Sequence, residues 1–317
     1  MTKIWFAPLH GITYFYFRNI FFKHFSGIDK VITPFVPVQA TEMLNVGKWI
    51  DFHSQNNPYL PIIPQLMGNI PTHFTDTIRA LHEYYGFTHF NWNIGCPMNG
   101  VVRKQRGCGL MPYPDKIEAV VEEIFNHTNC QFSIKMRLGL TQRNEAYTIM
   151  KRLNHYPIDF WVIHPRLGIE QYDFVPDWET LETLISLSTA PIIYSGDILT
   201  LEDAQKLQTK FPQINNIMLG RGLLKDPFLA EKIKKKSSSI KIEEDWKIRF
   251  YNFYQDLAQN YLSIKPERST LANFKELWHY FSVLFALSSS EKQQLLRIES
   301  WNEFYAKSCE FIFSEHV

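Results

Sequence analysis

Two reactive side chains of this sequence lie in or directly after short apolar runs. Cys96 follows the run 89–95 (HFNWNIG) and precedes Pro97, so its thiol is expected to be held rigidly at the end of a strand. Lys135 lies within the run 132–139 (FSIKMRLG), whose apolar neighbours would bury much of its stem. A buried ammonium group needs an anionic partner or a lowered pKa. These residues indicate a catalytic thiol and an anion-binding cation, or else a small buried cysteine and a lysine that reaches solvent.

Cys108 competes with Cys96 for the role of a functional thiol. It lies between two glycines in the sequence RGCGL, and it is either a thiol of a flexible loop or a packing residue. Spacing alone does not choose between the two. The cysteines form no C-x-x-C pair and are too scattered for a disulfide framework, so we expect free thiols and no metal site. They are Cys96, Cys108, Cys130 and Cys309.

Two glycine-containing motifs, SGD (195–197) and GRG (220–222), follow consecutive apolar runs. Glycines let the backbone approach an anion closely, and Arg221 supplies a cationic fork. Each motif alone is ordinary turn chemistry, but together they favour a phosphate-bearing cofactor. His164 and Arg166 bind a phosphate or a substrate edge in one interpretation, and are hydrogen-bonded within the protein in the other.

Eight β-rich runs separated by helical segments must position these side chains. The alternation is typical of parallel βα units, and eight of them predict an α/β fold that closes into a (β/α)8 barrel. The working groups of such a barrel lie at the carboxyl ends of its strands. The expected strands are 4–8, 31–36, 61–66, 89–95, 132–139, 159–166, 191–196 and 216–220. Eight helical segments are expected between and after them, for example 72–85, 114–125 and 201–211.

The composition changes after the eighth unit. The stretch 234–241 (KKKSSSIK) is polar and serine-rich, which is typical of a domain boundary. Beyond it, apolar residues recur at spacings of three and four, which predicts a small helical bundle. We therefore expect a catalytic barrel at residues 1–238 and a helical domain at residues 239–317.

The overall charge does not indicate a nucleic-acid partner, because the 317 residues carry a formal net charge of only +1. Any RNA contact must come from local patches such as Arg103, Lys104 and Arg106, or the run 234–236, and each patch is otherwise a solvated surface. The start of the sequence lacks the features of a signal peptide, and no segment holds 18 uninterrupted apolar residues. We expect a cytoplasmic monomer without a membrane partner.

Several motifs, read in order, closely resemble the tRNA-dihydrouridine synthases. The run from Asn93 to Met111 is the most specific of them, since a short GRG or SGD alone would prove little. The resemblance covers roughly residues 4–230 as motifs and continues more loosely into the helical tail. The motifs are APLHGIT, PQLMGNIP, NWNIGCPMNGVVRKQRGCGLM, IKMRLG, IHPRLG, SGDI and IMLGRGLLKDP.

The resemblance implies FMN at the barrel mouth, NADPH as reductant, and a helical domain that helps to hold tRNA. Carried over by position, Cys96 resembles the proton donor of the family, which favours it over Cys108. The expected substrate contacts are Asn93, Arg166, Arg103 and Lys104. The expected cofactor contacts are Pro8, Leu9, His10, Gln65, Lys135, His164, Ser195, Gly196, Asp197, Gly220 and Arg221.

Three departures from the family pattern concern the surroundings of the flavin. Leu9 stands where the family usually has Met, Ser195 where it usually has Asn, and Pro34 where a Glu commonly follows the threonine of strand two. The first change conserves volume, and the second alters one flavin hydrogen bond. Two other classes remain open: a flavin oxidoreductase acting on free pyrimidine bases, and a non-catalytic RNA-binding relative.

Overall fold

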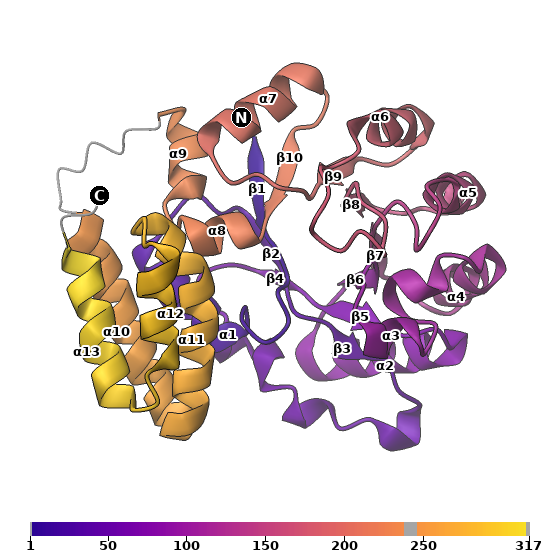
Figure 1. Cartoon of the computed structure of the whole chain (residues 1–317). Coiled ribbons are helices and arrows are strands. Elements are labelled where there is room, and N and C mark those ends of the chain that lie inside the picture. Colours follow the sequence, from indigo (N-terminus) through magenta and orange to yellow (C-terminus); the bar gives the residue numbers. More distant parts are fainter. Residues whose placement is uncertain (1, 238–245, 315–317) are drawn as a thin grey trace.

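The parallel strands of this chain curl into a barrel (Figure 1). The computed structural model describes residues 2–237 and 246–314. The strands are β1 (Lys3–Phe6), β2 (Lys30–Ile32), β3 (Val36–Pro37), β4 (Ile62–Ile63), β5 (Gln65–Met67), β6 (His89–Ile94), β7 (Gln131–Met136), β8 (Trp161–Ile163), β9 (Ile192–Tyr194) and β10 (Asn216–Leu219). They form one sheet in the order β3-β5-β6-β7-β8-β9-β10-β1-β2-β4.

The ten strands occupy eight positions, because two positions hold interrupted strands. β2 pairs with β4, and their continuations β3 and β5 pair with each other. The interruptions fall at Pro34 and Pro64, where proline cannot donate a ladder hydrogen bond. Since β4 leads into β5 through Pro64, the ring closes there. The predicted (β/α)8 barrel is confirmed.

Helices cover the outside of the barrel (Figure 1). In α4, for example, the buried residues Ile117, Val120, Val121 and Ile124 recur at the spacing of one helix face. The helices of this part are α1 (Phe15–His24), α2 (Pro71–Tyr85), α3 (Asn99–Val102), α4 (Pro114–His127), α5 (Asn144–Leu153), α6 (Trp178–Leu187), α7 (Leu201–Lys210), α8 (Arg221–Lys225) and α9 (Leu229–Lys235).

The expectation of a helix after every strand is wrong at the second position. Four 3-10 turns follow β3 instead, at Thr41–Met43, Val46–Lys48, Ile50–Phe52 and Ser54–Asn56. The four turns bury one side chain among them, that of Phe52, so no apolar helix face packs on the barrel here.

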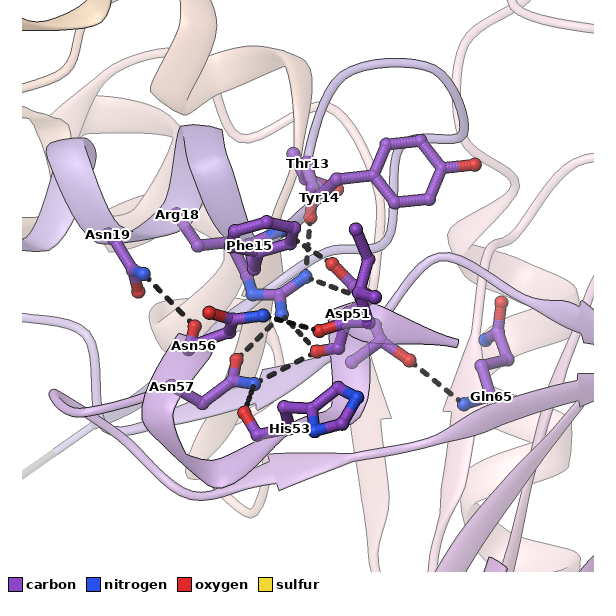
Figure 2. Close-up of polar contacts among 12 residues, drawn as sticks. Thr13, Tyr14, Phe15, Arg18, Asn19, Asp51, His53, Asn56, Asn57 and Gln65 are labelled. Atoms are coloured by element: carbon purple, nitrogen blue, oxygen red, sulfur yellow. Dashed lines mark hydrogen bonds and ion pairs between the residues drawn. The ribbon is translucent and has the colours of Figure 1, made fainter. Parts of the chain in front are cut away.

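Arg18 on α1 holds this turn segment in place (Figure 2). Its guanidinium group is buried and donates to the Thr13 carbonyl oxygen at 2.8 Å, to Asp51 Oδ2 at 3.0 Å and to Asn57 Oδ1 at 2.7 Å. Asp51 also accepts from the backbone N–H of Phe15 at 2.5 Å. The cluster therefore joins the 3-10 segment to the turn between β1 and α1. This turn follows the carboxyl end of β1, at the barrel mouth.

The barrel interior has an apolar wall and a polar wall. Strand alternation turns Ile4 and Phe6 outward into the large core beneath the helices and turns Trp5 and Ala7 inward. The apolar interior cluster is Trp5, Ala7, Ile32, Ile63, Phe160, Val162, Ile193 and Met218. The strands β5, β6 and β7 add instead the polar residues Gln65, Asn91, Asn93, Ser133 and Lys135.

The helical tail contains α10 (Trp246–Ile264), α11 (Glu267–Leu284), α12 (Ser289–Arg297) and α13 (Trp301–Phe313), as the apolar spacing predicted. In Figure 1 these helices stand beside the barrel, where α10 packs on α1 and α11 packs on α8. The predicted boundary at residues 238 and 239 lies outside the described residues. The predicted linker begins inside α9, where Lys234 Nζ bonds to Asp29 at 2.6 Å.

Candidate active site

A pocket of about 340 Å³ opens at the carboxyl ends of the strands. Its wall contains Asn93 of β6 and Cys96 after it, Lys135 of β7 and Arg137 after it, and the end of β1. α11 of the tail completes the wall with Glu276 and Tyr280. The remaining lining residues are Pro8, Leu9, His10, Ile12, Pro34, Phe35, Gly95, Pro97, Met98, Asn99, His164, Gln171 and Tyr172.

Cys96 is a half-buried thiol on a pinned loop. The side-chain oxygen of Asn93 accepts from the backbone N–H groups of Gly95 at 3.0 Å and of Cys96 at 3.1 Å. Burial raises the pKa of the Cys96 thiol, while a backbone hydrogen bond from Met98 and the charge of Lys135 oppose that shift. The thiol therefore stays protonated at neutral pH, as an acid must before it gives up a proton.

Cys108 supports this loop from a fully buried position. Its N–H donates to the Cys96 carbonyl oxygen at 3.1 Å. Burial raises the pKa of Cys108 to about 12. Gly107 adopts φ +55°, and a Cβ there would lie 2.5 Å from the Cys96 carbonyl oxygen, so the two segments approach closely through glycine. Among the described residues, the pocket is lined by Cys96 and not by Cys108.

Lys135 is a cation without a partner in the part of the chain that the structure describes, since its Nζ makes no hydrogen bond or ion pair there. It lies opposite Asn93 in the register of β6 and β7. Burial and the neighbouring charge of Arg137 lower the pKa of Lys135 to about 8. An ammonium group so placed binds an anionic group readily.

A smaller hollow of about 80 Å³ adjoins the pocket at the ends of β9 and β10. Arg221 lies at its edge, bonded to Asp197 at 2.5 Å and stacked over the Tyr172 ring at 4.1 Å. Glycine is required at Gly222, since a Cβ there would lie 2.2 Å from the Ile198 carbonyl oxygen. The hollow is also lined by Ser195, Gly196, Asp197, Gly220, Lys135 and His164. The Asp197 carboxylate is ion-paired with both Arg166 and Arg221, so the hollow still offers backbone and cationic groups to an anion.

His164 is fixed in one neutral tautomer. Arg166 Nη1 lies 3.0 Å from His164 Nε2, and because arginine only donates, Nε2 must be unprotonated. Burial and the charges of Arg137 and Lys135 hold the pKa of His164 well below its usual range. His164 lines both the pocket and the hollow, so its Nδ1–H is a hydrogen-bond donor for a bound group.

A family model described as dihydrouridine synthase matches residues 5–312 of the chain. The chain belongs to this dihydrouridine synthase family. Among its relatives, a "Probable tRNA-dihydrouridine synthase" of Staphylococcus aureus is 26% identical over 96% of this chain and 92% of its own length. The protein of that name from Rhizobium leguminosarum is 23% identical over 96% of this chain and 94% of its own.

A third relative is longer than this dihydrouridine synthase family member. The Xenopus tropicalis protein named "tRNA-dihydrouridine(47) synthase [NAD(P)(+)]-like" is 31% identical over 54% of this chain. The match spans about a quarter of that relative's own length, 27%, and the same holds for its counterparts from Xenopus laevis and Homo sapiens.

Four residues expected to bind ligands line neither the pocket nor the hollow of this family member. Gln65 is fully buried, and its amide bonds to Asn91 and Asn93. Arg166 is 2% exposed, and its guanidinium group bonds to Phe174, His164 and Asp197. Both therefore orient other residues. Arg103 and Lys104 are exposed on the turn after α3.

Several residues of this family member's pocket were not singled out from the sequence, and three of them are large or charged side chains from distant segments. Tyr172 comes from the loop after β8 and lies under the guanidinium groups of Arg221 and Arg137. The one sequence feature that could have identified Tyr172 is that it is an aromatic residue in the loop that follows His164. Glu276 and Tyr280 lie four residues apart on α11, a spacing shared by many solvated helix faces. Only the packing of the tail against the barrel brings them to the pocket.

Within residues 2–237 and 246–314, no group of three or more His, Cys, Asp or Glu side chains is placed to hold a metal ion. No helix in those ranges is long and apolar enough to cross a membrane.

Proposed function

We propose that this protein reduces specific uridines of tRNA to 5,6-dihydrouridine. The observation that carries the proposal is the protonated Cys96 thiol in the wall of a pocket that also holds the cationic Lys135. The names of the full-length bacterial relatives support tRNA as the substrate. We assign catalysis to residues 1–238, tRNA binding largely to residues 239–317, and the activity to the cytoplasm.

FMN is the cofactor that the chemistry of the pocket fits, with NADPH as its reductant. The hollow at β9 and β10 suits a phosphate, held by Arg221 and the backbone at Gly196 and Gly220. Lys135 and the His164 Nδ1–H would face an electron-rich ring that gains negative charge on reduction. When bound, the flavin supplies the hydride that reaches C6 of the uracil.

Cys96 supplies the proton. Its S–H bond breaks as a C–H bond forms at C5 of the base, and the electron pair of the S–H bond stays on sulfur as a thiolate. Lys135 and Arg137 stabilise that thiolate, since their charges favour the ionised form of Cys96. Asn93 holds the loop, so the thiol does not have to be oriented during the reaction.

The target uridine must leave the tRNA stack to reach this pocket, at a cost of about a few kcal/mol. Contacts to phosphates must offset this cost. Arg103 and Lys104 are exposed cations on the turn after the Cys96 loop, and we assign such contacts to them. The tail residues Glu276 and Tyr280 in the pocket wall favour a macromolecular substrate over a free base.

The proposed function can be tested in cells and with the purified protein. In cells lacking the protein, mass spectrometry of tRNA nucleosides should show a uridine that no longer carries two additional mass units. The purified protein should be yellow and should convert unmodified tRNA with NADPH, but should not turn over free uracil or orotate. A colourless protein would favour the non-catalytic relative, and turnover of free bases would favour the pyrimidine oxidoreductase.

A further inference from the structure

A chain of hydrogen bonds crosses the polar wall of the barrel and ends at the Cys96 loop. We call the side chains of Asn93, Gln65, Asn91 and Ser133 the amide relay. Asn93 Nδ2 donates to Gln65 Oε1 at 2.9 Å, Gln65 Nε2 to Asn91 Oδ1 at 2.7 Å, Asn91 Nδ2 to Ser133 Oγ at 3.0 Å, and Ser133 Oγ to the Phe90 carbonyl oxygen at 3.1 Å.

The direction of this chain is fixed by its two ends. The backbone N–H groups of Gly95 and Cys96 only donate, so the atom of Asn93 that faces them must be its oxygen. Asn93 must then donate to Gln65, and each later amide follows in the same sense. At the far end the Phe90 carbonyl oxygen only accepts, which agrees with a donating Ser133 hydroxyl. No amide can flip without breaking the chain.

Burial makes the links depend on one another. Gln65, Asn91 and Ser133 are fully buried, so a broken link leaves a polar atom without water to replace its partner. The apolar cluster fills the other side of the interior and offers no substitute. Loss of a link at β7 therefore loosens the hold of Asn93 on the loop at the pocket.

We propose that Asn91 and Ser133 are positioning residues for the proton donor: through Gln65 and Asn93 they fix the backbone of Cys96. Neither residue lines the pocket, so they act only through the relay. The role of Cys96 as proton donor rests on the proposed function. The placement of its thiol by the relay is testable without it.

The experiment compares Ser133→Ala with Ser308→Ala. Both serines are fully buried and hydrogen-bonded, but Ser308 bonds to Tyr254 within the tail, remote from the relay. The first readout is the alkylation rate of each cysteine by iodoacetamide from pH 6 to 10, resolved by peptide mass spectrometry. The second is kcat and KM for tRNA reduction. Asn91→Leu serves as a second relay variant.

In Ser133→Ala, we expect Cys96 to be alkylated at least about fivefold faster at neutral pH. We also expect the midpoint of the pH dependence of its alkylation rate to move to lower pH. Both changes follow because a loosened loop admits water. We expect kcat to fall about tenfold with KM unchanged, since the misplaced group acts only in the transition state. Ser308→Ala should leave the alkylation rate of Cys96 and kcat unchanged. Fully buried Cys108 reports on global unfolding and should stay unreactive in both variants.

The alkylation measurement tests the positioning of Cys96 by the relay, and the tRNA assay tests the proposed function, so the two claims can fail separately. If Cys96 in a folded Ser133→Ala protein keeps its alkylation rate and midpoint, the relay does not position the thiol. If Asn91→Leu also leaves them unchanged, the same conclusion holds for Asn91. If the unsubstituted protein reduces no tRNA but its Cys96 responds to Ser133→Ala, the proposed function fails while the relay stands.

Discussion

Replacing Asp51 by alanine should destabilise the protein far more than its position in an irregular segment suggests. The change removes the acceptor of Arg18 Nη1 and of the Phe15 N–H. The Arg18 side chain is 1% exposed, so its charge stays buried with only neutral oxygens as partners, those of Thr13, Asn57 and the backbone of residue 51. Breaking a buried ion pair in this way costs about 3 to 5 kcal/mol. The retained neutral acceptors place the expected loss near the lower end, about 3 kcal/mol.

The assay is urea unfolding, with thermal unfolding as a second measure. For a chain of 317 residues the expected loss lowers the melting temperature by about 4 to 5 °C. Arg18→Met should lower the free energy of unfolding less than Asp51→Ala does, because the Asp51 side chain is 13% exposed and still accepts a hydrogen bond from the Phe15 N–H. The exposed pair Lys307–Glu310 provides the control, and Glu310→Ala should change stability by less than about 0.5 kcal/mol. A loss below about 1 kcal/mol in Asp51→Ala would refute the argument.

Three further predictions concern the pocket and the exposed turn after α3. Cys96→Ala should lower the rate of tRNA reduction by about 10²- to 10⁴-fold, whereas Cys130→Ala, at a half-buried thiol outside the pocket, should leave the rate unchanged. The pKa of Lys135 is about 8 in the folded protein, below its ordinary value of 10.5. Between pH 8 and pH 10.5 the unfolded chain therefore binds more protons than the folded protein, so the free energy of unfolding should rise with pH over this range. Lys135→Met should abolish this rise and, in the same protein, weaken flavin retention on gel filtration; a rise that persists would contradict the burial argument. Binding of tRNA should weaken steeply between low and moderate salt, and Arg103→Glu with Lys104→Glu should flatten that dependence, as filter binding would show.

The barrel was predictable from the sequence because its signals are local. Eight apolar runs with intervening helical periodicity determine the strand positions, and Cys96 and Lys135 belong to such runs. The 3-10 segment was not predictable in the same way, since its order comes from Arg18, which lies more than 20 residues before it. A long-range ion pair leaves no periodic trace.

The site was partly predictable for the same reason. Residues at strand ends, such as Cys96 and Lys135, reach the pocket directly. The sequence did not distinguish a side chain that faces a ligand from one that supports it, as Gln65 and Arg166 show, because hydrogen-bond partners depend on tertiary packing. The contribution of α11 depends wholly on how the tail docks.

The two α11 residues in the pocket wall have a consequence for how this protein can be divided. A barrel expressed alone would lack Glu276 and Tyr280, and one side of its cavity would open to bulk solvent. Exchanging tails between relatives would therefore alter one side of the pocket wall. Under the proposed function, selectivity for a particular nucleotide is then a joint property of both parts and should not transfer with either one alone.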